Sequence, residues 1–107
     1  MFETLIQKLQ EDKYLTLETT PQHEPSMHNI IERIKKFKLQ DRVDGFSCTD
    51  NPLAKLKYNA LFASLKLQME FKKPVIATMS MRDRNKIALQ SDLMGANDFD
   101  VRAILAL

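Results

Sequence analysis

The chain has 107 residues, of which 44% are apolar, and this size and composition suit one soluble domain. Sixteen basic and fourteen acidic residues are mixed along the sequence and leave a net charge of +2, so no basic stripe favours nucleic acid as a partner. No stretch approaches the roughly 20 apolar residues of a membrane span, and charges interrupt the N-terminus too often for a secretion signal. The single cysteine, Cys48, agrees with a reducing compartment, so we expect a cytoplasmic protein.

Hydrophobic periodicity and turn residues predict helices and strands in strict alternation. The expected helices cover residues 2–9, 27–38, 54–71 and 84–96, and Ser26 is the expected N-cap of the second helix. The expected strands cover residues 14–20, 43–50, 74–80 and 101–107. Such alternation implies right-handed crossovers and a parallel sheet. Two architectures fit, namely an open doubly wound sheet and the first half of a (β/α)8 barrel. A complete barrel needs about 250 residues, so this chain cannot close one alone.

Each of the first three expected strands ends in polar residues, at the point where chemistry collects in parallel α/β folds. These endings are Glu18-Thr19-Thr20, residues 47–51 (SCTDN) and residues 78–85 (TMSMRDRN). Loops are polar in general, and a threonine at a strand end can simply be a β-former at the surface. The strand endings are therefore candidate site residues, with ordinary loop polarity as the alternative.

Glu18 is the strongest of these candidates. It lies on the same side of its strand as Thr16 and opposite Leu15 and Leu17. In a barrel it would point into the top of the lumen, where an unpaired carboxylate is costly. A carboxyl group in such a place keeps its proton more readily and could act as a proton donor near neutral pH.

Three segments, "LTLETTP", "FSCTDNPLAK" and "RDRNKIALQSDLMGANDFDVRAILAL", resemble the N-terminal half of the methylenetetrahydrofolate reductase family. The resemblance covers the chain from Leu15 to Leu107, and the segments occur in the family's order. It implies a flavin-dependent (β/α)8 barrel and so favours the half-barrel over the open sheet.

The resemblance implies functions for several strand-end residues. Glu18, followed by Pro21, matches the family glutamate that acts as general acid and helps to open the methylene bridge of methylenetetrahydrofolate. Thr49 matches a threonine beside the flavin and the substrate, and Asp50 is next to it in the flavin-contacting stretch. FAD is the implied cofactor, and a folate and a reduced nicotinamide or other electron donor are the implied partners.

The third strand ending departs from the family pattern, because Thr78 stands where many members have a flavin-contacting histidine. Thr78 can still form a hydrogen bond, and Ser80 is expected to orient flavin or folate in the same way.

Arg82 or Arg84 could bind phosphate or the glutamyl tail of folate, since guanidinium groups hold such oxyanions in a bidentate manner. The alternative for these arginines is a solvated loop in which Asp83 pairs with its neighbours.

Family members follow the fourth strand with a Gly-Asp pair near the flavin, and this sequence ends at Leu107, before that pair. We therefore expect one partial domain over residues 1–107, an α/β fold that forms the first half of a TIM barrel with parallel strands and is truncated after the fourth strand. The expected function is that of a fragment of a flavin-dependent oxidoreductase, which reduces methylenetetrahydrofolate to methyltetrahydrofolate in one-carbon and methionine metabolism. We expect the chain alone to be inactive.

A half-barrel exposes the edges of its first and fourth strands, so we expect a homo-oligomer or association with the missing half. The alternative function is a non-catalytic α/β module that binds a partner through these open edges. No metal site is expected, and no glycine-rich phosphate loop is present.

Overall fold

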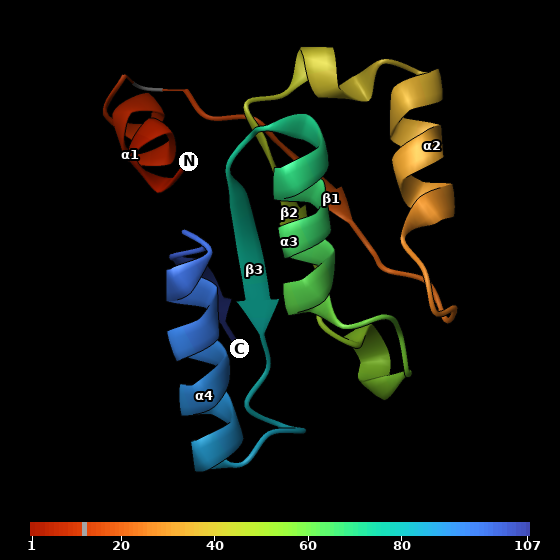
Figure 1. Cartoon of the computed structure of the whole chain (residues 1–107), viewed down its shortest axis with the longest axis vertical. Coiled ribbons are helices and arrows are strands. Elements are labelled where there is room, and N and C mark those ends of the chain that lie inside the picture. The colour runs from red at the N-terminus through yellow and green to blue at the C-terminus, as the bar shows by residue number, and fades with distance from the viewer. Residues whose placement is uncertain (12) are drawn as a thin grey trace.

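The computed structural model describes residues 1–11 and 13–107. Helices and strands alternate along the chain, as the sequence predicted (Figure 1). The α-helices are α1 (Phe2–Gln10), α2 (His28–Lys36), α3 (Ala60–Phe71) and α4 (Lys86–Asp98). The strands are β1 (Thr16–Thr19), β2 (Gly45–Cys48), β3 (Val75–Met79) and β4 (Ala103–Ala106). Two short 3-10 helices are η1 (Leu39–Arg42) and η2 (Pro52–Ala54).

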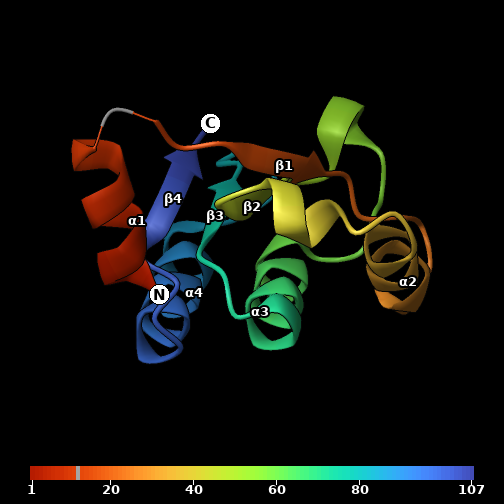
Figure 2. The same cartoon turned by 90° about the horizontal axis from the view of Figure 1, so that it is seen from above.

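The four strands form one parallel sheet in the order β1-β2-β3-β4. Helices α2, α3 and α4 all lie on the same face of this sheet (Figure 2). Strands in sequential order with right-handed crossovers place every connecting helix on one side. The sheet is therefore wound in a single direction and differs from a doubly wound sheet, in which helices cover both faces.

The core lies between the sheet and these helices. Alternate strand residues point toward α2, α3 and α4, and the buried ones include Phe46, Cys48, Val75 and Ala77. The ring of Phe46 packs against that of Phe71, with centroids 5.2 Å apart. Complete burial of these apolar side chains stabilises the sheet against its helices, at about 1.5–3 kcal/mol for each large side chain.

The opposite face of the sheet carries Glu18, Ser47, Ile76 and Ala103 in one row, because these residues are partners in the parallel register. Glu18 is exposed, whereas Ser47, Ile76 and Ala103 are half-buried. β1 and β4 are the two edges of the sheet. This uncovered face is the one that would line the lumen of a closed barrel.

Tyr14 covers the start of β2 on this open face. A Cβ placed on Gly45 would lie 2.2 Å from Tyr14 Oη and 2.5 Å from the carbonyl oxygen of Pro74, so only glycine fits there. Asp44, the preceding residue, accepts a hydrogen bond of 2.8 Å from the backbone N–H of Leu15. These contacts fix how the chain enters β1.

Helix α3 begins later than the sequence predicted, at Ala60 rather than at residue 54. Leu53 and Ala54 have positive φ angles of 59° and 58°, which do not occur within a regular right-handed α-helix. Asn59 then caps the helix, with its side-chain oxygen accepting a hydrogen bond from Phe62 N.

Helical spacing would place Leu61, Phe62 and Met69 on one apolar stripe of α3, and the structure buries only part of it. Phe62 and Met69 are 60% and 62% exposed, and small residues such as Ala60, Ala63 and Ser64 are buried in their place. Small side chains let the helix approach the sheet closely, and Phe62 and Met69 lie on the side of the helix that faces away from it.

Among the residues that the structure describes, none of the helices is both long enough and apolar enough to cross a membrane.

Candidate functional site

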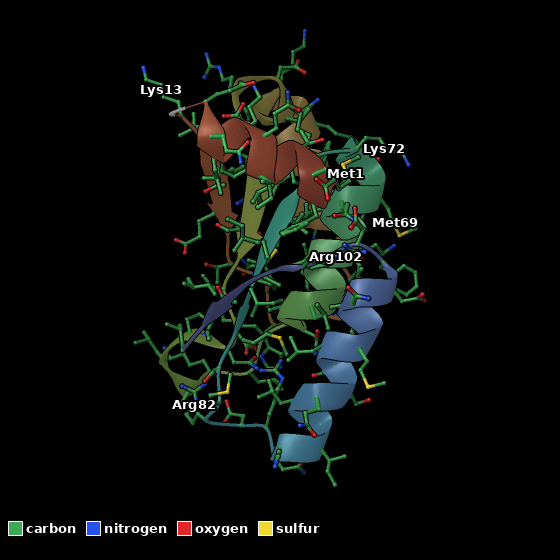
Figure 3. The ribbon with its side chains drawn as sticks, turned by 90° about the vertical axis from the view of Figure 1, so that its left-hand side faces the viewer. Met1, Lys13, Met69, Lys72, Arg82 and Arg102 are labelled. Atoms are coloured by element: carbon green, nitrogen blue, oxygen red, sulfur yellow. The ribbon has the colours of Figure 1, made fainter. Side chains whose placement is uncertain are left out.

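All four strands are parallel, so the loops that follow β1, β2 and β3 leave the sheet at the same end. Figure 3 shows Arg82 at this end of the molecule, while Lys13 and Lys72 lie at the opposite end. The predicted site residues all belong to the end marked by Arg82: Glu18 on β1, Thr49 and Asp50 after β2, Thr78 on β3, and Ser80 and Arg82 after β3. The strand-end location predicted from the sequence is thus confirmed.

Asp50 is the centre of the best-connected polar cluster at this end. Its side chain is 2% exposed and accepts a hydrogen bond of 2.8 Å from the backbone N–H of Ser80. The same carboxylate forms an ion pair with Arg84, whose Nη1 donates to Oδ2. The loops that follow β2 and β3 are therefore joined through one buried carboxylate.

Arg84 completes this connection with further bonds. Its guanidinium is 11% exposed and donates to the carbonyl oxygen of Ser80 and to Asp92 Oδ2, each at 3.2 Å. The hydrogen bond to Asp50 is the main cause of a raised pKa for Arg84, so the group is a permanent cation. We call Asp50, Ser80, Arg82 and Arg84 the strand-end network.

Arg82 belongs to the network through its backbone and has its own acidic partner. Its backbone N–H donates to Ser80 Oγ at 3.2 Å, and its Nη2 donates to Asp83 Oδ2 at 2.7 Å and to the carbonyl oxygen of Asn51 at 3.0 Å. The bond to Arg82 lowers the pKa of Asp83. Asp83 thus pairs with its neighbour in an exposed loop, the alternative that the sequence left open.

Asp50 and the two arginines were predicted to contact ligands, and the structure shows Asp50 bonded to Arg84. The sequence does contain the opposite charges, because Asp50 ends the second expected strand and Arg84 follows the third. Their contact depends on the register of β2 against β3, which the sequence alone did not give.

The predicted threonines are differently placed. Thr49 follows Cys48, and its Oγ1 is buried without a hydrogen-bond partner in the part of the chain that the structure describes. Thr78 lies on the open-face side of β3, in register with Leu105, and is buried. A buried hydroxyl without a partner is costly, so the Oγ1 of Thr49 is available to a ligand.

Cys48 is a free and fully buried cysteine. Its Sγ lies 3.2 Å from Thr19 Oγ1, and burial raises the pKa of the thiol. A thiol that holds its proton is a poor nucleophile.

Glu18 is separate from the strand-end network. It is exposed at the edge of the sheet and lines a pocket of about 220 Å³ together with Leu17, Thr20, Ile30 and Arg33, among others. The structure therefore presents two features at the strand ends: a bonded network after β2 and β3, and an accessible carboxylate on β1.

Comparison with known proteins gives no match to a protein-family model, to a curated protein or to a solved structure.

Proposed function

We propose that the chain is the N-terminal half of a flavin-dependent methylenetetrahydrofolate reductase barrel. The proposal has two sources, the resemblance of three sequence segments and the position of Glu18. The observation that carries it is an accessible glutamate on the uncovered face of a parallel sheet, at the carboxyl end of its first strand. In (β/α)8 barrels, reacting groups come from that end of the strands.

The half-barrel form of the proposal is supported by the winding of the sheet. Four parallel strands in sequential order, with α2, α3 and α4 on one face, are what half of an eight-stranded barrel requires (Figure 2). Both sheet edges would then pair with the strands of the other half.

The unpartnered hydroxyl group of Thr49 is the observation that most favours a flavin near these loops. Its orphaned Oγ1 could bond to a polar atom of FAD, and the hydroxyl groups of Thr78 and Ser80 follow on the next strand. Asp50 and Arg82 fit less well as direct flavin ligands, because both already have protein partners. In this proposal they hold the loops in place while the three hydroxyl residues contact the cofactor.

Glu18 would supply a proton to the folate nitrogen that leaves the methylene carbon when the methylene bridge opens. When bound and reduced, FAD would supply the hydride that this carbon receives. Ser47, next to Glu18 in the register, lies on the same face and could help to orient the folate.

Flavin binding by the 107-residue chain is the first test. We expect the chain to shift the visible spectrum of added FAD weakly, because only half of the barrel is present. Thr49→Val should weaken this binding, and Thr4→Val, a change of the same kind at an exposed position of α1, should not. Equal binding by both variants and the unchanged chain would remove Thr49 from the flavin site.

The reaction itself should be assayed in the longer protein, if the reading frame continues past Leu107 with further βα units. There, Glu18→Gln should lower kcat for methylenetetrahydrofolate reduction by at least about a hundredfold, which is typical for loss of a general acid, while bound flavin is retained. A variant as active as the parent protein would overturn the assignment of Glu18.

A second candidate function is a non-catalytic module that binds a partner through its sheet edges. The exposure of Leu105 in the edge strand β4, and of Leu107 just after it, favours this function. A natural stop codon after Leu107, together with no flavin binding, would support this function over the enzyme.

A further inference from the structure

A second pocket, of about 390 Å³, lies between the loop after β1 and the start of α2. Its charged and polar lining includes His23, Glu24, Asn29, Arg33 and Lys57. Lys57 comes from the segment before α3, which is fixed to the β1 loop by a hydrogen bond of 2.8 Å from Tyr58 N to the carbonyl oxygen of Gln22. We call it the basic pocket.

The basic side chains of the basic pocket differ from Arg82 and Arg84 in their charged partners. Among the described residues, His23, Arg33 and Lys57 take part in none of the ion pairs, whereas Arg82 and Arg84 do. The one acidic residue in the lining is Glu24, whose two carboxylate oxygens lie 3.4 and 3.3 Å from Asn29 Nδ2. Basic groups therefore outnumber acidic ones in a space large enough for several ligand atoms.

The basic pocket also adjoins the pocket of Glu18. Both are lined by Gln22, Ile30 and Arg33, so a ligand with one end at Glu18 could reach Arg33 without leaving the surface hollow. The joined pockets have guanidinium and ammonium groups at one end and a carboxyl group at the other. This arrangement would suit an extended ligand that has an anionic end.

We propose that Arg33, Lys57 and His23 bind oxyanion groups of the ligand whose reacting part lies at Glu18. This proposal rests on the proposed function. It assigns the anion contact to the basic pocket instead of Arg82 and Arg84, whose guanidinium groups already bind Asp83 and Asp50. The oxyanions would be either carboxylates of a glutamyl tail or phosphates of the flavin dinucleotide. The two sources share the same recognition chemistry.

The test measures anion binding directly, without flavin or turnover. γ-Linked triglutamate and inorganic pyrophosphate are each titrated into the 107-residue chain by calorimetry at low and high salt. We expect binding that weakens with salt, and a Kd raised about threefold to fivefold by Arg33→Gln and by Lys57→Gln, the range of an exposed charge pair. Tighter binding of triglutamate would assign the pocket to a substrate tail, and tighter binding of pyrophosphate would assign it to the cofactor.

Two matched variants control for general loss of positive charge. Lys36→Gln changes α2 outside the pocket, and Lys66→Gln changes an exposed residue of α3. Both should bind the probes as the unchanged chain does. If all four variants weaken binding equally, or if neither probe binds, the proposal is overturned. Because flavin is absent from this experiment, failure of flavin binding would count against the proposed function and leave the result on the basic pocket unaffected.

Discussion

At the scale of single residues, Tyr14 shows how a polar atom is held where water cannot reach it. Its Oη is buried and has no hydrogen-bond partner among residues 1–11 and 13–107, and it lies close to the space that a side chain at position 45 would fill. Burial, and secondarily the negative charge of Asp44, raises the pKa of Tyr14 to about 12. The phenolate is therefore disfavoured in the folded chain.

This raised pKa predicts a loss of stability in alkali. An unfolded tyrosine ionises near pH 10 and Tyr14 in the folded chain near pH 12, so its contribution is complete below pH 10 and is lost as the pH rises through 12. Tyr14→Phe should remove that loss and leave the stability at neutral pH unchanged or slightly higher, because an unpaired hydroxyl is deleted. Urea unfolding at about pH 7 and about pH 11 measures the difference.

Tyr58→Phe is the control for this experiment, and the alkaline loss should persist in that variant. A Tyr14→Phe chain that loses as much stability in alkali as the unchanged chain would show that Tyr14 is not the group responsible.

At the scale of elements, the strand-end network joins the loops that follow β2 and β3. Asp50→Ala would leave Arg84 without its main partner and Ser80 N without its acceptor, so the free energy of unfolding should fall by about 3 kcal/mol. Asp83→Ala, which removes an exposed pair with Arg82, should have no measurable effect. Denaturant unfolding of both variants checks the prediction, which equal stabilities would contradict.

The elements themselves were largely predictable, because their patterns are local. Apolar strands such as residues 75–79 and the periodic helix at residues 2–10 are specified by their own side chains. The start of α3 was not predicted, although Asn59 is a typical capping residue, because Tyr58 and Leu61 continue an apolar pattern across the true boundary.

The candidate site was predictable in location and less so in its contacts. Polar residues after parallel strands must share one end of the sheet, which placed Glu18, Thr49 and Thr78 correctly. The pairing of Asp50 with Arg84 joins residues 34 positions apart, and it depends on how two strands and a helix start meet in space.

At the scale of the whole molecule, the two sheet edges and the open face predict self-association. Leu105 and Leu107 are exposed near the edge formed by β4, and β1 forms the other edge. Unpaired strand edges with apolar neighbours favour pairing with another chain. We therefore expect size-exclusion chromatography with light scattering to show a species larger than the 12.4 kDa chain.

Leu105→Lys should shift this species toward the monomer, because it puts a charge on the open face. Leu53→Lys, at an even more exposed leucine in η2, should leave the association unchanged. A compact monomer formed by the unchanged chain would contradict the prediction.

The position of Glu18 on an edge strand has a consequence for when the proposed chemistry could begin. Any strand that pairs with β1 becomes the immediate neighbour of this carboxylate, so the partner determines half of its surroundings. In the proposed enzyme, the proton donor would then be present in the first half but would acquire its working environment only when the barrel closes. Assembly would serve as a safeguard, since an unfinished barrel could bind parts of its ligands without acting on them.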